Sequence, residues 1–299
     1  MTDPLDLDLL PRLSDERVRL AAHAASRAVA LAAGRHRFSG FVWRPGLVVT
    51  ADEALPEDAE VRAALAGPEG GAARTAGATV VGRDASTDVA LLRVEAGDEA
   101  AVAFSEAPLA VGASVLVAGA DGHGPLVVGG AVSRVGPEWR SLRGGRIDAR
   151  VELDLRLPRA AEGAAVHDAR GRAIGMAVTG PRRRTLLIPA ATVERVAAAL
   201  ERDGRIARGR IGAALQTIAL DGGGHGLAVA SVEPDGPAAR AGLCQGDLVV
   251  GIDGEPPGPL RAMMARLGPG SVGTELVLAV RRGGEDREIP ITIDERPDD

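Results

Sequence analysis

The chain has 299 residues, of which 45% are hydrophobic and 25% are charged, so it has the composition of a globular protein and the length of two domains. Its net charge of -6 argues against a nucleic-acid-binding protein, and no apolar run is long enough to cross a bilayer. The single cysteine, Cys244, excludes an intrachain disulfide and a cysteine-built zinc site. Acidic residues stand near the N-terminus, where a signal peptide needs basic ones, so we expect a cytoplasmic protein.

The first predicted element is a helix over residues 14–34. Ser14 suits its N-cap, Asp15 and Glu16 suit its first turn, and Gly34 suits its end. Short β-branched runs separated by Gly, Pro and Asp turns follow, which is typical of an all-β barrel or sandwich. These predicted strands are residues 41–43, 47–50, 80–81, 90–94, 115–117 and 126–128.

A second helix is predicted after residues 188–192 and ends near Asp203 and Gly204. The residues beyond it repeat a cycle of short strands and one helix, in a segment long enough for a small domain. The sequence therefore predicts three parts: an N-terminal helical segment, 1–35; a β domain, 36–204; and a C-terminal domain, 205–299.

Two segments of the β domain resemble the HtrA (Deg) family of trypsin-like serine proteases. Residues 39–43 and 48–55 are similar to the strand pair that ends in the catalytic histidine of the family, and Glu53 occupies that place. Residues 81–92 are similar to the segment around the catalytic aspartate, which Asp88 matches. The resemblance implies a mainly β, trypsin-like double barrel behind the N-terminal helix.

A third segment is similar to the glycine-rich turn that carries the catalytic serine and forms the oxyanion hole. Counting on from Asp154, or back from residues 168–175, places Glu162 at the serine position. Gly163 remains, whereas Ala160 and Ala164 replace two glycines of the family pattern, which puts the oxyanion geometry in doubt.

The sequence has no histidine between His36 and His123 and no serine between Ser141 and Ser231. A Glu53 carboxylate lacks the N–H through which an aspartate orients an imidazole, and a carboxylate is a poor nucleophile for acyl transfer. His167 is a weaker candidate for a relocated base. From these positions we expect no catalytic residue, no cofactor and no enzymatic activity.

Residues 208–213, 232–243 and 246–254 resemble a bacterial PDZ domain, an α+β fold; the alternative is an unrelated small β domain. Residues 248–252 are expected to form a buried strand of this domain. PDZ domains bind a chain end by strand addition, while backbone N–H groups of a short loop receive its carboxylate. By resemblance, that loop is Arg210, Ile211, Gly212 and Ala213, and the groove helix runs from about Pro259 to Leu267. Its apolar face would comprise Leu260, Met263, Met264 and Leu267, although methionines at helical spacing also suit a plain core.

The favoured hypothesis is a non-catalytic scaffold or adaptor that binds protein or peptide C-termini through the PDZ domain, with no nucleic-acid or membrane partner and with self-association left open. The alternatives are an active HtrA-type endopeptidase with unrecognised catalytic residues and a cation or small-ligand binder at the acidic site. Glu53, Asp88 and Glu162 would repel one another there. A retained proton, an arginine or a hard cation could relieve this, and we favour an arginine and expect no metal; alternatively, Glu53 and Glu162 turn outward into solvent.

Overall fold

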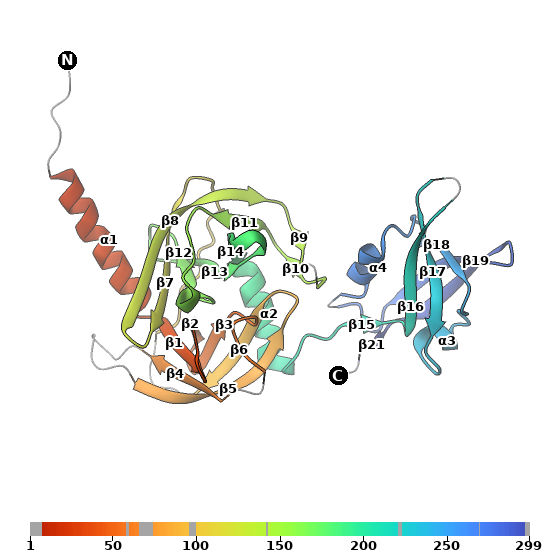
Figure 1. Cartoon of the computed structure of the whole chain (residues 1–299), viewed down its shortest axis with the longest axis horizontal. Helices are drawn as coiled ribbons and strands as arrows, with labels where there is room; N and C mark the ends of the chain where they lie inside the picture. The colour runs from red at the N-terminus through yellow and green to blue at the C-terminus, as the bar shows by residue number, and fades with distance from the viewer. Residues whose placement is uncertain are drawn as a thin grey trace, which may run out of the picture. The chain divides into compact units, whose positions relative to one another are not determined.

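The structure is a computed structural model, and it describes residues 8–57, 60–65, 74–95, 100–141, 143–220, 223–268 and 270–296. The chain divides into two compact units, residues 1–139 with 146–205, and residues 140–145 with 206–299. Figure 1 labels the helices and strands of both units. Within the described ranges, no helix has the length and apolar character needed to cross a membrane.

The first barrel of the larger unit is closed, with the strand order β1-β2-β3-β6-β5-β4. Every neighbouring pair is antiparallel, and alternate apolar side chains fill the interior, including Leu31, Phe38, Val48 and Leu92. The predicted strand at residues 47–50 is confirmed with the same bounds. The strands are β1 (Ala28–Ala33), β2 (His36–Arg44), β3 (Leu47–Thr50), β4 (Val61–Leu65), β5 (Arg74–Asp84) and β6 (Val89–Val94).

The second barrel is also closed, in the order β11-β14-β13-β12-β7-β8. Its strands are β7 (Ser114–Asp121), β8 (Gly124–Gly136), β11 (Arg150–Leu153), β12 (Ala165–His167), β13 (Ala173–Thr179) and β14 (Thr185–Pro189), and a hairpin of β9 (Trp139–Arg140) and β10 (Arg146–Ile147) lies between β8 and β11. The helix α2 (Ala190–Asp203) follows, and Gly204 ends it in the left-handed conformation at φ 72°. The predicted double barrel and second helix are confirmed.

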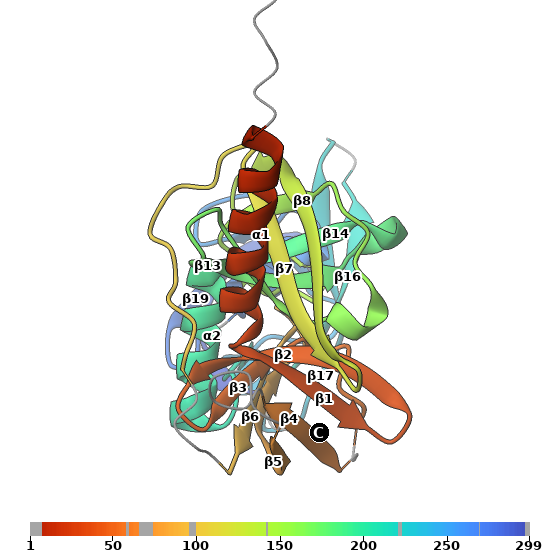
Figure 2. The same ribbon diagram turned by 90° about the vertical axis from the view of Figure 1, so that its left-hand side faces the viewer.

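The N-terminal helix differs from its prediction. Helix α1 spans Leu9–Ala25, so Ser14 lies inside it, and Gly34 belongs to the turn between β1 and β2. Residues 28–33 form a strand because β2 and β4 pair with both of its edges, and this pairing outweighs the helix propensity of its alanines. Figure 2 shows α1 lying along β7 and β8.

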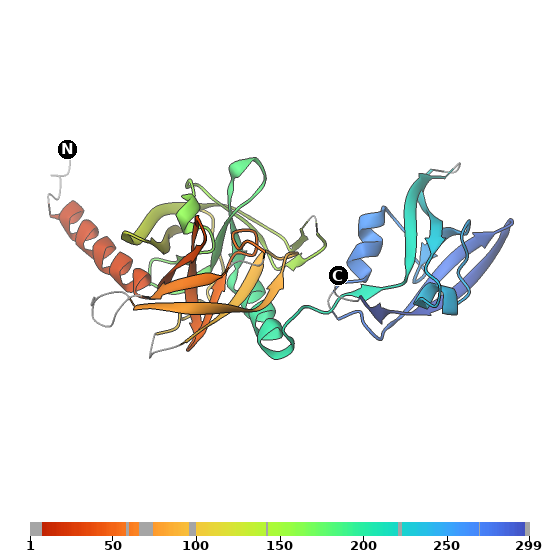
Figure 3. The ribbon, with the colours of Figure 1, turned by 60° about the horizontal axis from the view of Figure 1, so that its bottom comes forward.

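The smaller unit contains a five-stranded antiparallel sheet in the order β16-β17-β18-β19-β20, with β16 at one edge. Figure 3 shows helix α4 (Leu260–Arg266) beside that edge, where the N–H of Leu260 donates to Thr217 Oγ1 over 3.1 Å. The predicted strand at residues 248–252 is confirmed as β18. The remaining elements are β15 (Gly209–Arg210), β16 (Ala213–Ala219), β17 (His225–Val232), α3 (Pro237–Arg240), β18 (Leu248–Ile252), β19 (Glu275–Arg282), β20 (Glu285–Thr292) and β21 (Asp294–Glu295).

The two barrels meet at Ser39 of β2, a side chain with 0% exposure. Its hydroxyl donates to the carbonyl oxygen of Ala160 over 2.6 Å and accepts the N–H of Ala120 over 3.0 Å. Its backbone N–H donates to the carbonyl oxygen of Glu162 over 2.9 Å. One residue of the first barrel therefore fixes two segments of the second.

We expect Ser39→Ala to lower the free energy of unfolding by about 1–3 kcal/mol, because it leaves the partly buried N–H of Ala120 and carbonyl of Ala160 without the Ser39 hydroxyl. Urea unfolding followed by circular dichroism measures the change. Ser26→Ala is the control, since the Ser26 hydroxyl is exposed and should change stability by under about 0.5 kcal/mol. Equal effects of the two substitutions would contradict the role of Ser39.

Candidate active site between the barrels

Glu53 lies in the turn that follows β3, and its side chain is exposed. Arg83 of β5 holds this turn in place: its Nε donates to Asp52 Oδ1 over 2.6 Å, and a guanidinium N–H donates to the carbonyl oxygen of Leu55 over 2.8 Å. The guanidinium thus fixes the backbone from which the Glu53 side chain projects.

Asp88 ends the turn between β5 and β6 and has a left-handed backbone at φ 59°. Asp84, with 2% exposure, organises this turn by accepting the hydroxyls of Ser86 and Thr87 over 2.6 and 2.7 Å. The N–H of Glu53 donates to Asp88 Oδ1 over 2.8 Å. The structure therefore brings together the two positions that the sequence placed at the histidine and the aspartate.

Glu162 follows a short 3-10 helix, Arg159–Ala161, and its side chain turns toward β13. The N–H of Thr179 donates to Glu162 Oε1 over 2.5 Å, and the Thr179 hydroxyl donates to Oε2 over 2.6 Å. The alternative that Glu162 simply turns outward into solvent is therefore wrong. Sequence reasoning missed Thr179, because no motif marks a contact that depends on one rotamer of a distant glutamate.

Backbone groups of the Glu162 turn form hydrogen bonds and close contacts within the protein. The N–H of Glu162 donates to the carbonyl oxygen of Arg159 over 3.3 Å, so it is turned toward that oxygen. Gly163 has φ 81°, and a Cβ there would lie 2.5 Å from the carbonyl oxygen of Ser39 and 2.6 Å from the N–H of Ala51. Only glycine fits at 163, which explains why this glycine remains while its neighbours are alanines.

The carboxyl groups at this site act on one another electrostatically. Burial is the main reason that the pKa of Asp88 is raised to about 7, and the charges of Glu53, Glu162 and Asp52 raise it further against the hydrogen bond from the Glu53 N–H. Burial also raises the pKa of Glu162, with Glu53 adding to the effect and Arg159 opposing it. Of the forms of relief that the sequence left open, a partly retained proton fits the raised pKa of Asp88, and an arginine, Arg159, acts on Glu162.

His167 does not serve this site as a base. Its side chain is 1% exposed on β12, and burial is the largest cause that lowers its pKa to about 4. Within the described parts of the chain, no group of three or more His, Cys, Asp or Glu side chains could hold a metal ion.

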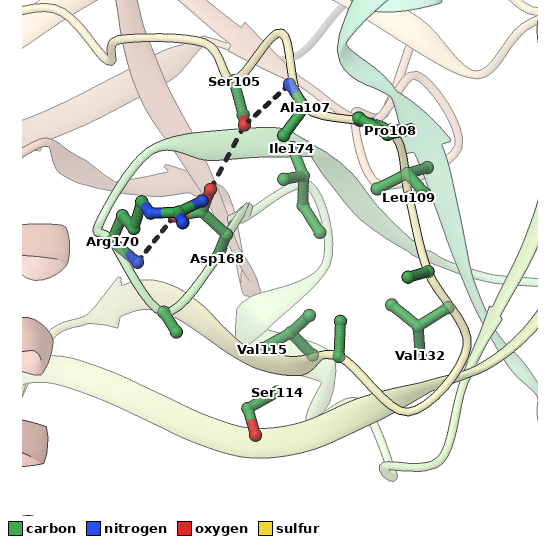
Figure 4. A pocket seen from close by; sticks show the side chains of 13 residues that line it. Ser105, Ala107, Pro108, Leu109, Ser114, Val115, Val132, Asp168, Arg170 and Ile174 are labelled. Carbon is green, nitrogen blue, oxygen red and sulfur yellow. Dashed lines mark hydrogen bonds between the residues drawn. The ribbon is translucent and has the colours of Figure 1, made fainter.

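A second feature of the larger unit is an apolar cavity of about 390 Å³, distinct from the three carboxylates. Figure 4 shows Ser105, Asp168 and Arg170 at one side of it and Leu109 and Val115 at another. Asp168 accepts the Ser105 hydroxyl over 3.2 Å and the backbone N–H of Arg170 over 2.8 Å, so its charge stabilises the turn beside the cavity.

In the smaller unit, the residues expected to receive a chain end lie between β15 and β16. Ile211 is 2% exposed in the core, and Arg210 pairs with Glu233. Gly212 has φ 69°, and a Cβ there would lie 2.9 Å from a Glu233 carboxylate oxygen. A larger residue at 212 would therefore strain the loop as well as crowd a ligand, whereas Ala213 begins the edge strand β16.

The apolar residues expected on the groove helix divide into two groups. Met263, with 1% exposure, and Leu267, with 8%, belong to the core of the smaller unit, as the alternative of plain core packing anticipated. Leu260 packs partly against that core, and Met264 is 46% exposed. Met264 is thus the expected contact residue that α4 presents to solvent.

Comparison with known proteins agrees with this architecture. Residues 38–176 match the family model of the trypsin-like peptidase domain, and residues 209–293 match that of the PDZ domain. A solved serine endoprotease from Yersinia pestis is 25% identical, with a TM-score of 0.73 over 94% of this chain and 98% of its own. The chain thus combines a trypsin-like peptidase domain with a PDZ domain. The HtrA-type protease AlgW, solved with a decapeptide, shares the fold at a TM-score of 0.74 and 21% identity, covering 94% of this chain and 99% of its own.

Curated proteins that are similar to this chain are named probable periplasmic serine endoproteases, DegP-like. The one from Halomonas elongata is 30% identical over 236 residues, and the one from Brucella suis is 31% identical over 248. The matches cover 74% of this chain but 49% and 46% of those relatives, so the chain spans about half of their length.

These names overturn three expectations drawn from the sequence. The expectations of a non-catalytic scaffold and of a protein without enzymatic activity are wrong, since the relatives are named serine endoproteases. The expectation of a cytoplasmic protein is wrong, since the relatives are named periplasmic. The inferences failed because they rested on three side chains and on terminal composition, whereas the similarity extends over most of the chain.

The raised pKa of Asp88 predicts that the folded protein loses stability as the pH rises from about 4 to about 7. In this range the unfolded Asp88 has released its proton, while the folded one retains it, so each pH unit costs up to about 1.4 kcal/mol. Thermal unfolding between pH 5 and 8 measures this slope.

Asp88→Asn should flatten the slope, because asparagine can still accept the Glu53 N–H but does not titrate. Asp203→Asn, at the exposed end of α2, is the matched control and should leave the slope unchanged. A slope that is the same in the parent and in Asp88→Asn would contradict the raised pKa.

Proposed function

We propose that this chain is a periplasmic polypeptide hydrolase of the HtrA family in which carboxyl groups, rather than a serine and a histidine, carry the chemistry. Glu53, Asp88 and Glu162 stand at the three triad positions in this proposal. The observation that carries it is the raised pKa of Asp88, which keeps a partly protonated acid beside the exposed Glu53 carboxylate at neutral pH. The names of the relatives support the hydrolase class and the compartment.

The chemistry follows from one proton donor and one proton acceptor near a peptide bond. Glu53 takes a proton from water as the water oxygen bonds to the carbonyl carbon, and Asp88 gives its proton to the carbonyl oxygen. When the carbon–nitrogen bond breaks, the amine takes the proton held by Glu53, and the hydroxyl returns its proton to Asp88. Both carboxyls regain their starting state, and one water is consumed.

This route suits the backbone of the Glu162 turn. Serine-type acyl transfer depends on backbone N–H groups aimed at the developing oxyanion. Here the N–H of Glu162 donates to Arg159, so protonation of the carbonyl oxygen by Asp88 takes the place of that stabilisation. The route also needs no serine between Ser141 and Ser231, where the sequence has none.

We also propose that the PDZ-like domain, taken as residues 205–299, recruits polypeptide ends. An added strand would pair with the outer edge of β16, next to α4, and Met264 is the exposed apolar side chain of that helix expected to contact it. The backbone of residues 210–213 would receive the chain-end carboxylate. The family match over residues 209–293 supports peptide binding in general.

Cleavage of an unfolded, casein-like substrate tests the hydrolase proposal. We expect the parent to cleave it, and Asp88→Asn to lower the rate by about 100-fold or more, since general acid catalysis contributes about that much. The rate should fall above pH 7 as Asp88 loses its proton. A fluorophosphonate should neither label nor inhibit the protein.

Asp203→Asn is the control for this assay as well and should retain the parent rate. Three outcomes would contradict the proposal: no cleavage by the parent, an unchanged rate in Asp88→Asn, or inhibition by the fluorophosphonate. The purified Asp88→Asn protein also serves as the control for contaminating proteases, because it passes through the same purification.

Peptide binding tests the second proposal. The full chain should bind peptides with hydrophobic C-termini at about micromolar Kd, near -8 kcal/mol, and amidation of the terminal carboxylate should weaken binding about tenfold or more. Met264→Glu should weaken binding too, because it places a charge beside the apolar ligand. Fluorescence anisotropy measures all three.

Val272→Glu is the control for this substitution, since Val272 is also exposed, at 36%, but lies outside α4. Equal affinity for free-acid and amidated peptides would remove the carboxylate-capture model. Equal affinity of Met264→Glu and Val272→Glu would place the peptide elsewhere.

A further inference from the structure

Thr179 presents two hydrogen-bond donors to one carboxylate. Its backbone N–H donates to one oxygen of Glu162, and its hydroxyl donates to the other, over 2.5 and 2.6 Å. Such two-point recognition of a planar carboxylate is directional and strong, because each oxygen receives its own donor. We call these two donors the Thr179 notch.

The notch lies at the end of a strand edge. On one side β13 pairs with β14 up to Thr179 and Thr185. On the other side, the pairing of β12 with β13 begins at Ala165 and Met176. The turn before β12 also bonds to β13, but only as far as Ala177, whose N–H donates to the carbonyl oxygen of Ala164 and whose carbonyl oxygen accepts the N–H of Gly163. Thr179 is the next edge position, and an N–H there needs an acceptor that the sheet does not supply.

Solvent can reach Thr179, and the surroundings of the Glu162 carboxylate that fills the notch disfavour its charged form. Thr179 is exposed, and Glu162 is half-buried. Burial and the Glu53 charge raise the pKa of Glu162 despite the two bonds from Thr179. An external carboxylate can therefore approach the donors from solvent while the Glu162 side chain moves aside.

The segment after Thr179 is basic. Residues 181–184 are exposed, and they include Arg182 and Arg183, each with a left-handed backbone at φ 58°. Left-handed non-glycine residues are costly, and such strain is concentrated at functional sites. Two guanidinium charges on this loop favour an anion at the neighbouring notch over a neutral acceptor.

We propose that the Thr179 notch is a carboxylate-binding site, filled by Glu162 when no ligand is present and taken over by a carboxylate of a bound polypeptide. An acidic side chain and a chain end both supply this chemistry. The choice of a polypeptide as its source rests on the proposed function, whereas the existence of the notch does not.

Small carboxylates test the notch without any cleavage. In Glu162→Ala the donors of Thr179 lose their internal partner, and acetate should replace it, raising the melting temperature saturably by about 2–4 °C relative to chloride at equal ionic strength. Glu162→Ala/Thr179→Val lacks the hydroxyl donor and should lose most of this rise. The parent, with its notch filled, should show none.

An equal acetate response of Glu162→Ala and of the double variant would overturn the proposal, as would an equal response of the parent. If Glu162→Ala does not fold, Glu162→Ser replaces it, because a serine side chain at position 162 is too short to span the two donors of Thr179. These outcomes do not depend on hydrolysis, so a failure of the notch is distinguishable from a failure of the proposed function.

Peptides then identify the source of the carboxylate. The same variants are titrated with an amidated peptide containing one glutamate, a free-acid peptide without acidic side chains, and an amidated peptide without either. The smaller unit is identical in all variants, so the difference between Glu162→Ala and the double variant reports the notch alone. A difference for the first peptide assigns an acidic side chain, a difference for the second assigns a chain end, and no difference for either refutes a polypeptide ligand.

Discussion

The hydrogen bonds of Ser39 hold in place the turn that carries Glu162. They join β2 of the first barrel to β7 and to the turn before β12, and the Ser39 N–H is bonded to the carbonyl of Glu162 itself. Gly163 makes this approach feasible, because any Cβ there would collide with the Ser39 carbonyl. The seam between the barrels therefore also builds the site, because the backbone N–H of the buried Ser39 holds the carbonyl of Glu162 in the other barrel.

Carboxylates stand at the two positions that the sequence resemblance assigned to a histidine and a serine, and they act on the electrostatics of this seam. An imidazole would share its N–H with Asp88, whereas Glu53 offers Asp88 only its backbone N–H and adds a like charge. Two unit charges 4 Å apart repel by about 4 kcal/mol at an effective dielectric constant of 20. The raised pKa of Asp88 favours its neutral form, and the Glu162 carboxylate turns toward the two donors of Thr179. Both features reduce the repulsion among these groups.

The sequence predicted those parts of the fold whose signals are local. Residues 47–50 and 248–252 are bounded by turn residues, so the bounds of these two strands were accurate. The helix before Gly204 carries its own stop signal, so its end was accurate, whereas it begins at Ala190 rather than after residue 192. The alanine-rich segment 28–33 was assigned to a helix because its strand partners are distant in the chain. The sequence did not identify Ser39 or Thr179 for a related reason. Ser39 bonds to a partner more than a hundred residues away and Thr179 to a partner across a turn, and no spacing rule connects either pair. Triad positions could be counted from motifs, but the function inferred from their side chains was wrong.

In the two proposals, Glu162 would connect the acid role of Asp88 with ligand binding at Thr179. Its negative charge is among the causes that raise the pKa of Asp88, so the position of the Glu162 side chain changes how readily Asp88 holds its proton. A ligand carboxylate at Thr179 would add one negative charge to those of Glu53, Glu162 and Asp52 near Asp88. Protonation of Asp88 relieves that repulsion, and binding and protonation must favour each other by the same factor. An acidic polypeptide would therefore draw onto Asp88 the proton that its own hydrolysis requires, which gives the unusual carboxylate at position 162 a role in matching substrate charge to the protonation state of the site.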